Sequence, residues 1–179
     1  MSGIIADNSG RSSGVIATTA VSDPTYLQFP ATQVASADAN RLDDYEEGTF
    51  SVALDCGSGT ATLNGSYDTA GYIKVGRIVH IAGFFALSAI SSPSGTLRIT
   101  GLPFTVGGVS EDGDSSCIPL YINSSLTSGP IPGGVTGYTY ASVSNIKCVR
   151  GGADTSNTVA DFLHASSYIG IGGSFIASA

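Results

Sequence analysis

The chain has 179 residues, which is enough for one domain with its own core and short for two ordinary domains. A hydrophobic content of 42% argues against a disordered protein, because disorder accompanies low hydrophobicity and high net charge. The net charge is −7, and the seven Lys and Arg are scattered without forming a basic stripe, which argues against nucleic-acid binding.

The first 41 residues have neither the periodicity of an amphipathic helix nor the alternation of a strand. Small polar residues separate their few large apolar side chains, so this segment cannot form a core of its own. We therefore expect an extended N-terminal arm that becomes ordered only by packing on a partner. The candidate partner-binding residues are Ile4, Ile5, Val15, Ile16, Tyr26, Leu27 and Phe29.

Neither a secretory signal nor a membrane span is expected. The first ten residues, MSGIIADNSG, lack both a basic region and a long apolar core. The longest apolar run, residues 78–90, is interrupted by polar residues and is shorter than the ~20 residues that a membrane helix needs. We expect the protein to be made and assembled in a cytoplasm, without membrane insertion.

Residues 41–50, RLDDYEEGTF, concentrate charge in a chain of which only 12% is charged. We interpret this cluster as the boundary between the arm (1–41) and a folded domain (42–179), with Asn40 as the N-cap of a short turn that Leu42 and Tyr45 anchor. A calcium site is the alternative, although the spacing differs from the D-x-[DN]-x-[DN]-G pattern of a cation loop. The acidic residues are Asp43, Asp44, Glu46 and Glu47.

From residue 49 onward the pattern indicates β-strands. Phe50, Val52 and Leu54 alternate with small or polar residues, which predicts a half-buried strand. Asn64-Gly65 predicts a hairpin turn between strands at 61–63 and 72–75.

A long strand is predicted over residues 77–88, and both of its faces are apolar. One face carries Val79, Ile81, Phe85 and Leu87, and the other carries Ile78, His80 and Phe84. This two-sided pattern is expected of a central strand or of a strand at a subunit interface.

The rest of the chain continues as short strands separated by turns, with no convincing helix. This pattern predicts an antiparallel β-sandwich or jelly-roll domain. Residues 158–164 fit a helical turn and a strand equally well. The predicted segments are a turn at 91–95 and strands at 96–100, with Leu97 and Ile99 inward, at 118–122, at 138–149 and at 168–176.

The chain offers little that suggests catalysis, a cofactor or a metal. Cys56, Cys117 and Cys148 form no CxxC motif, so we interpret them as small buried strand residues without a disulfide. His80 reads as a core or interface residue, and His164 has no nucleophile motif near it. No enzyme activity is expected, although a carboxylate pair for glycoside cleavage stays open because the fold places such residues.

Three stretches carry a resemblance to a known family: FPATQVASADANRLDDYEEGTFSVAL, GYIKVGRIVHIAGFFAL and SGTLRITGLPF, within residues 29–104. In order and spacing they resemble a module frequent in tail-fibre and other virion proteins of tailed bacteriophages. Phe50 stands where the module usually has Trp, and an arm of 40 residues replaces the long fibre or enzymatic region that commonly precedes it. The resemblance implies a homotrimeric β-knob on the virion surface, assembled in the host bacterial cytoplasm.

Two functions agree with these patterns. The first is a structural protein, a capsid decoration (cement) or short fibre that its arm attaches to other proteins of the capsid or tail. The second is a receptor-binding fibre tip that recognises a host surface glycan or protein. Tyr121, Tyr138 and Tyr140 are the candidate receptor-facing aromatic residues, although packing within a sheet explains them equally well.

Overall fold

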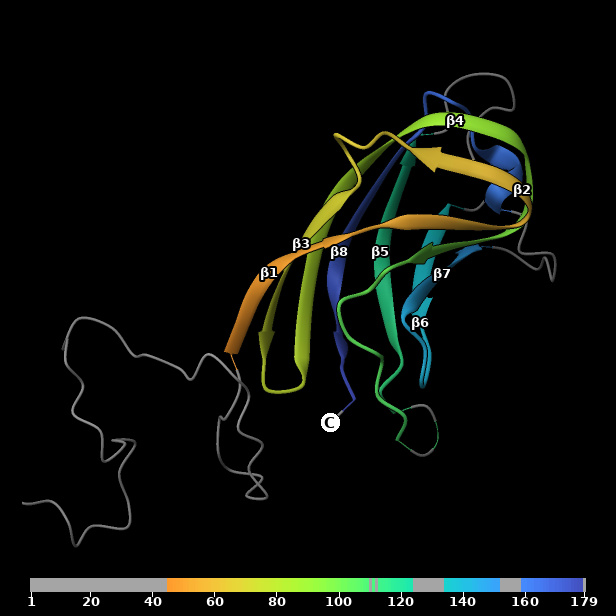
Figure 1. Ribbon diagram of the computed structural model, residues 1–179. Coiled ribbons are helices and arrows are strands. Elements are labelled where there is room, and N and C mark those ends of the chain that lie inside the picture. The colour runs from red at the N-terminus through yellow and green to blue at the C-terminus, as the bar shows by residue number, and fades with distance from the viewer. Residues whose placement is uncertain (1–44, 110, 112, 124–133, 152–158, 179) are drawn as a thin grey trace, which may run out of the picture.

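The computed structural model describes residues 45–109, 111, 113–123, 134–151 and 159–178. The predicted arm and its contact residues from Ile4 to Phe29 lie outside these residues, as do Asp43 and Asp44. The described chain is all-β, as predicted (Figure 1). Its strands are β1 (Tyr45–Ser51), β2 (Ala53–Leu63), β3 (Thr69–Val75), β4 (Ile78–Thr100), β5 (Ser116–Asn123), β6 (Val135–Thr139), β7 (Asn145–Arg150) and β8 (Tyr168–Ile176).

The strands form a closed barrel with additional strands at its side, and all of the pairings are antiparallel. The order β4-β7-β6-β5-β8 closes on itself because β8 also pairs with the first half of β4. A first sheet contains β1, β3, the first half of β4, β8 and the second half of β5. A second sheet contains β2, the second half of β4, β7, β6 and the first half of β5.

Strand β4 passes from the first sheet to the second by arching over one end of the molecule (Figure 1). Two residues in the left-handed region, Ser92 (φ 42°) and Gly95 (φ 82°), take up the bend. The Gly95 N–H donates to Asp161 Oδ1 (2.7 Å). The predicted turn at 91–95 is therefore wrong, because β2 keeps pairing with β4 on both sides of the bend, with shifts in register.

The predicted hairpin at Asn64-Gly65 is also wrong. The turn exists, since the Tyr67 N–H donates to the Asn64 carbonyl (2.7 Å). However, β2 pairs with β4, whereas β3 pairs with β1 and with another part of β4. The Asn64 N–H donates to the Ala86 carbonyl (2.8 Å), so the turn docks on β4 and lies between strands that do not pair with each other.

Two further predictions are refined by the structure. The strand expected over 138–149 is divided into β6 and β7, which pair antiparallel around a turn where Ser142 has φ 62°. In the segment 158–164 that the sequence left open, the described residues form a 3-10 helix, Val159–Phe162. This helix packs against β4 and β7. No helix in the described part of the chain is long and apolar enough to cross a membrane.

The core fills the barrel from the inward side of every strand. The predicted inward faces of β4 are confirmed: Val79, Ile81, Phe85, Leu97 and Ile99 are fully buried. Strand β8, which lies beside β4 within the same sheet, contributes buried residues that alternate in the same way. Alternation of apolar and polar residues thus placed the core correctly in both predicted parts of β4.

At the end of the molecule opposite the β4 arch, Arg77 in the β3–β4 turn forms an ion pair with Asp114 and hydrogen bonds with the C-terminal end of the chain (Figure 1). Arg77 Nη2 lies 2.6 Å from Asp114 Oδ2, and the Arg77 Nε–H donates to the Ala177 carbonyl (2.8 Å). The Ala177 N–H returns a hydrogen bond to the Arg77 carbonyl (2.7 Å). The Asp114 side chain is only 8% exposed, and the ion pair with Arg77 compensates for the burial of its carboxylate.

We predict that Gly101→Ala destabilises the protein much more than Gly76→Ala. Both glycines are in the left-handed region (φ 92° and 58°), so both substitutions add strain of about 1 kcal/mol or more. A Cβ at Gly101 would also overlap the Ser51 carbonyl oxygen, whereas a Cβ at Gly76 meets open space. We expect a loss of about 1 kcal/mol at Gly76 and at least about 3 kcal/mol at Gly101, measured by urea unfolding. Equal losses would contradict the predicted overlap.

Candidate functional site

The outer face of the first sheet exposes an unusual number of large apolar side chains. Alternate residues of a strand point to opposite faces, and those opposite the core point outward here. The prediction of a two-sided β4 is confirmed, since Ile78 and Phe84 are exposed on the face away from Phe85. We call this surface the apolar face. Its large exposed residues are Tyr45, Ile73, Val75, Ile78, Phe84, Tyr121 and Tyr168.

Three of these residues form what we call the aromatic ridge: Phe84 on β4, Tyr121 on β5 and Tyr168 on β8. The Phe84 ring is stacked on Tyr121 at 6.2 Å and on Tyr168 at 5.6 Å between centroids. Gly170 on β8 lies between Phe84 and Tyr121 in register. A Cβ on Gly170 would come within 3.1 Å of the Phe84 ring, so this glycine lets the two rings approach each other above it. The ridge side chains nevertheless remain 42–57% exposed.

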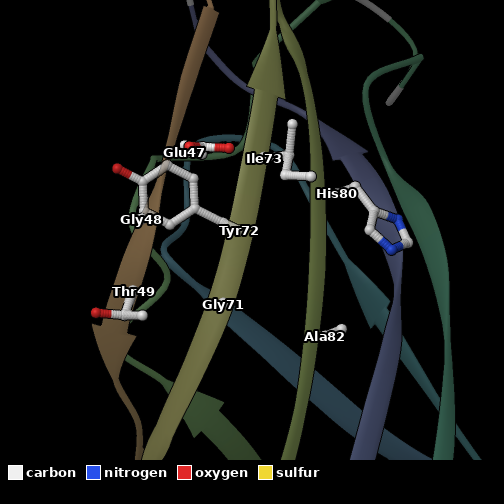
Figure 2. A pocket seen from close by; sticks show the side chains of 8 residues that line it. All are labelled: Glu47, Gly48, Thr49, Gly71, Tyr72, Ile73, His80 and Ala82. Atoms are coloured by element: carbon white, nitrogen blue, oxygen red, sulfur yellow. The ribbon is translucent and has the colours of Figure 1, made fainter.

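Beside the ridge lies a groove of about 520 Å³, lined by parts of β1, β3 and β4 (Figure 2). Figure 2 shows most of the lining residues in two rows that cross the strands, with Gly48 and the Tyr72 ring between the rows. One row consists of small residues, Thr49, Gly71 and Ala82, which pair with one another in register. The neighbouring row forms the wall of the groove and consists of Glu47, Ile73 and His80.

Two ionisable side chains belong to this wall. Glu47 Oε2 accepts a hydrogen bond from the Tyr45 hydroxyl (3.0 Å), and this bond, together with the carboxylate charge, raises the pKa of Tyr45. His80 Nδ1 lies 3.1 Å from Ser174 Oγ. His80 is exposed, so its interpretation as a core residue is wrong, whereas an interface role is compatible with its position. A carboxylate and an imidazole above a floor of small residues suit binding of a partly polar group.

The outer face of the second sheet, which we call the charged face, differs in character. Arg98 pairs in register with Asp55 on one side, where their side chains lie 3.0 Å apart, and with Lys147 on the other. Lys147 Nζ lies 5.6 Å from the centre of the Tyr138 ring. Tyr138 also contacts Tyr140, with centroids 6.0 Å apart.

The three tyrosines that the sequence grouped as receptor-facing therefore lie on two different surfaces. Tyr121 belongs to the aromatic ridge, whereas Tyr138 and Tyr140 lie over the second sheet. No sequence signal separated them, because strand alternation identifies the outward side of a strand but not the sheet to which it belongs. For the same reason the sequence did not predict the groove, because its lining residues come from three different strands.

The acidic cluster has a different structure from the one expected. Tyr45 to Glu47 begin strand β1, so the short turn predicted there is wrong for these residues. Glu46 Oε1 lies 3.8 Å from the ammonium of Lys74, which is only 4% exposed and sits 5.1 Å from the Phe104 ring centre. Glu47 lies on the opposite face of β1 from Glu46 and forms part of the groove wall. Within the described ranges, no three His, Cys, Asp or Glu side chains are grouped as a metal site.

The cysteines occupy three different environments. Cys148 on β7 is fully buried, and burial raises the pKa of its thiol to about 12. Cys56 on β2 is half-buried, and its pKa is raised by burial and then by the nearby Asp55 charge. Cys117 on β5 is exposed, so the prediction of three buried cysteines is wrong there. It points outward because it lies in register with Tyr138 on the charged face.

Comparison with known proteins gives one match of fold. No protein-family model matches the chain, and no curated protein matches it. The fold is similar to part of the crystal structure of Dettilon tailspike protein (gp208), with a TM-score of 0.60 and 24% sequence identity. The match covers 74% of this chain and 24% of the tailspike chain, so it spans about a quarter of that protein's length. It supports the β-rich architecture.

We predict that alkylation of the native protein will distinguish the three thiols. The thiolate is the reactive form, so a raised pKa and burial both slow the reaction. Iodoacetamide at pH 8, read by peptide mass spectrometry, should modify Cys117 first, Cys56 more slowly and Cys148 only after unfolding. Cys117→Ser should remove the fast phase alone. Rapid labelling of Cys148 in the folded protein, or an intact mass that reveals a disulfide, would contradict this assignment.

Proposed function

We propose that the chain is a non-enzymatic structural component of a tailed-bacteriophage virion, a homotrimeric β-module of the tailspike or tail-fibre kind. The likeness of its fold to part of the Dettilon tailspike protein carries this proposal. The resemblance of residues 29–104 to a module of phage virion proteins supports it independently, because it rests on sequence motifs. Between a capsid decoration and a position on the tail, the tailspike likeness favours the tail.

The environments of the candidate catalytic groups are compatible with a structural role. His80 contacts a serine on an open strand face, and Asp161, near His164, is bound to the Gly95 backbone. The barrel and its additional strands would form the jelly-roll-like knob of the module, exposed on the virion surface.

A receptor-binding tip is the second candidate function, and the charged face favours it. There Tyr138 and Tyr140 offer partly exposed rings beside Lys147 and Arg98. Aromatic faces flanked by cations suit a host surface glycan, through stacking and charge-assisted hydrogen bonds.

We predict that the purified full-length chain is a trimer. The apolar face gives a reason, because it exposes several large apolar side chains, and exposed apolar patches on a soluble protein commonly mark an interaction site. Sedimentation velocity at micromolar concentration should give three times the chain mass of 18.0 kDa. A stable folded monomer under these conditions would contradict the proposal.

We further propose that residues 1–41 attach the module to other virion proteins, and that residues 42–179 fold without them. The buried residues of the described chain run from Phe50 to Ala177 and form a continuous core. An arm with few large apolar groups cannot offset its own ordering cost of roughly 1–2 kcal/mol per residue, but burial on a partner could return about 1.5–3 kcal/mol per large side chain.

Deletion of residues 2–38 is the test of this division. We expect a soluble trimer with nearly unchanged β circular dichroism that no longer joins virions. Full-length protein, added to the same assembly reaction, is the control. If the truncated chain unfolds, the arm is part of the core. If it folds and still joins particles, the β-domain itself carries the attachment surface.

A further inference from the structure

We infer that the aromatic ridge of one copy docks into the groove of the next copy, so that the subunits contact each other head to tail around a ring. This inference rests on the proposed trimer and assigns its contact surface. The groove is lined by β1, β3 and β4, and the ridge by β4, β8 and β5, so a single copy offers both at different places on one face.

The first argument is the exposure of the ridge. Phe84, Tyr121 and Tyr168 are 53%, 57% and 42% exposed although they stack on one another. Packing within the chain therefore leaves about half of each ring in water. Aromatic side chains clustered in this way are the usual centre of a protein interface, because they bury a large area at a small cost in side-chain entropy.

The second argument is charge, and it permits another copy of the chain as the occupant. Each copy carries a net charge of −7, so two copies repel unless they meet through a weakly charged surface. Among the described side chains of the ridge and the groove, Glu47 carries a carboxylate and His80 an imidazole, and the others are apolar, hydroxyl-bearing or glycine. The ion pairs of Arg98 with Asp55 and of Arg77 with Asp114 involve other parts of the molecule.

The third argument is shape. The groove, at about 520 Å³, falls within the roughly 300–1,000 Å³ typical of ligand clefts, and the small residues Gly71 and Ala82 leave it open. A ring of Tyr121 or Tyr168 would lie over these residues and against Ile73. The tyrosine hydroxyl would then form a hydrogen bond with the Glu47 carboxylate or the His80 imidazole. A purely apolar side chain could not form this bond.

The fourth argument concerns symmetry. A contact between two different patches is heterologous, and such contacts close into a ring when the rotation between subunits permits it. Face-to-face packing of two identical apolar faces would instead produce a two-fold dimer. Ridge-into-groove contact is thus an arrangement that can close with three subunits.

Two full-length variants test the contact, one on each side of it. Tyr121→Asp places a carboxylate on the ridge, and Ala82→Asp places one in the groove. Thr136→Asp is the matched control, because Thr136 is an exposed outward position on β6 in the second sheet. Circular dichroism and protection of Cys148 from alkylation check folding. Should Ala82→Asp not fold, Thr49→Arg on the exposed edge of the groove replaces it.

We expect each site variant alone to weaken association by at least about 30-fold and to sediment as a monomer, whereas Thr136→Asp stays a trimer. In an equal mixture of the two site variants, Ala82→Asp supplies an intact ridge and Tyr121→Asp supplies an intact groove. At high concentration it should therefore form a heterodimer that cannot close, with twice the mass of one chain.

Other outcomes overturn the inference in distinguishable ways. Trimeric site variants would show that this face is not the contact, and the proposed trimeric virion module would still stand. If those trimers also lost binding to host cells, the ridge would be a receptor surface. A mixture that stays monomeric, or single variants that form dimers, would overturn the head-to-tail arrangement. A monomeric wild type would overturn the proposed trimer itself.

Discussion

The structure depends on one strand, β4, which takes part in both sheets. Its first half pairs with β3 and β8, and its second half pairs with β2 and β7, so the barrel closes through this strand. A strand of 23 residues can do this only if it bends sharply, and left-handed backbone at Ser92 and Gly95 provides the bend. The side chain of Asp161 binds the Gly95 amide, so the 3-10 helix stabilises the point at which the two sheets part.

The two outer faces of this architecture have opposite chemistry. The first sheet exposes apolar and aromatic side chains around a groove, whereas the second carries the Asp55–Arg98 ion pair and Lys147 over the Tyr138 ring. Such a division gives a module one surface suited to subunit contact and another suited to solvent or to a polar ligand. It also reconciles the structural and receptor-binding functions, since each would use a different face of the same subunit.

Much of the fold follows from local sequence patterns, and the errors have a common cause. The inward faces of β4 and the extent of β8 were predicted correctly, because alternation of side chains is a property of a single strand. The predictions of a hairpin at Asn64-Gly65 and of a turn at 91–95 were wrong. Turn residues indicate where the chain changes direction, but they do not determine which strands pair with each other. The same glycines and serines that end a strand in one context bend it in another.

The sequence by itself determined an all-β chain, the apolar and polar sides of β4 in its two predicted parts, and the apolar character of both faces of its first half. Only the tertiary structure decided which outward residues meet. Phe84, Tyr121 and Tyr168 come from strands far apart in the chain and stack because β8 lies between β4 and β5. Tyr121 and Tyr138 both point away from the core, yet Tyr121 belongs to the first sheet and Tyr138 to the second. The physical reason is that alternation acts over two residues, whereas strand pairing depends on the free energy of the whole packed barrel.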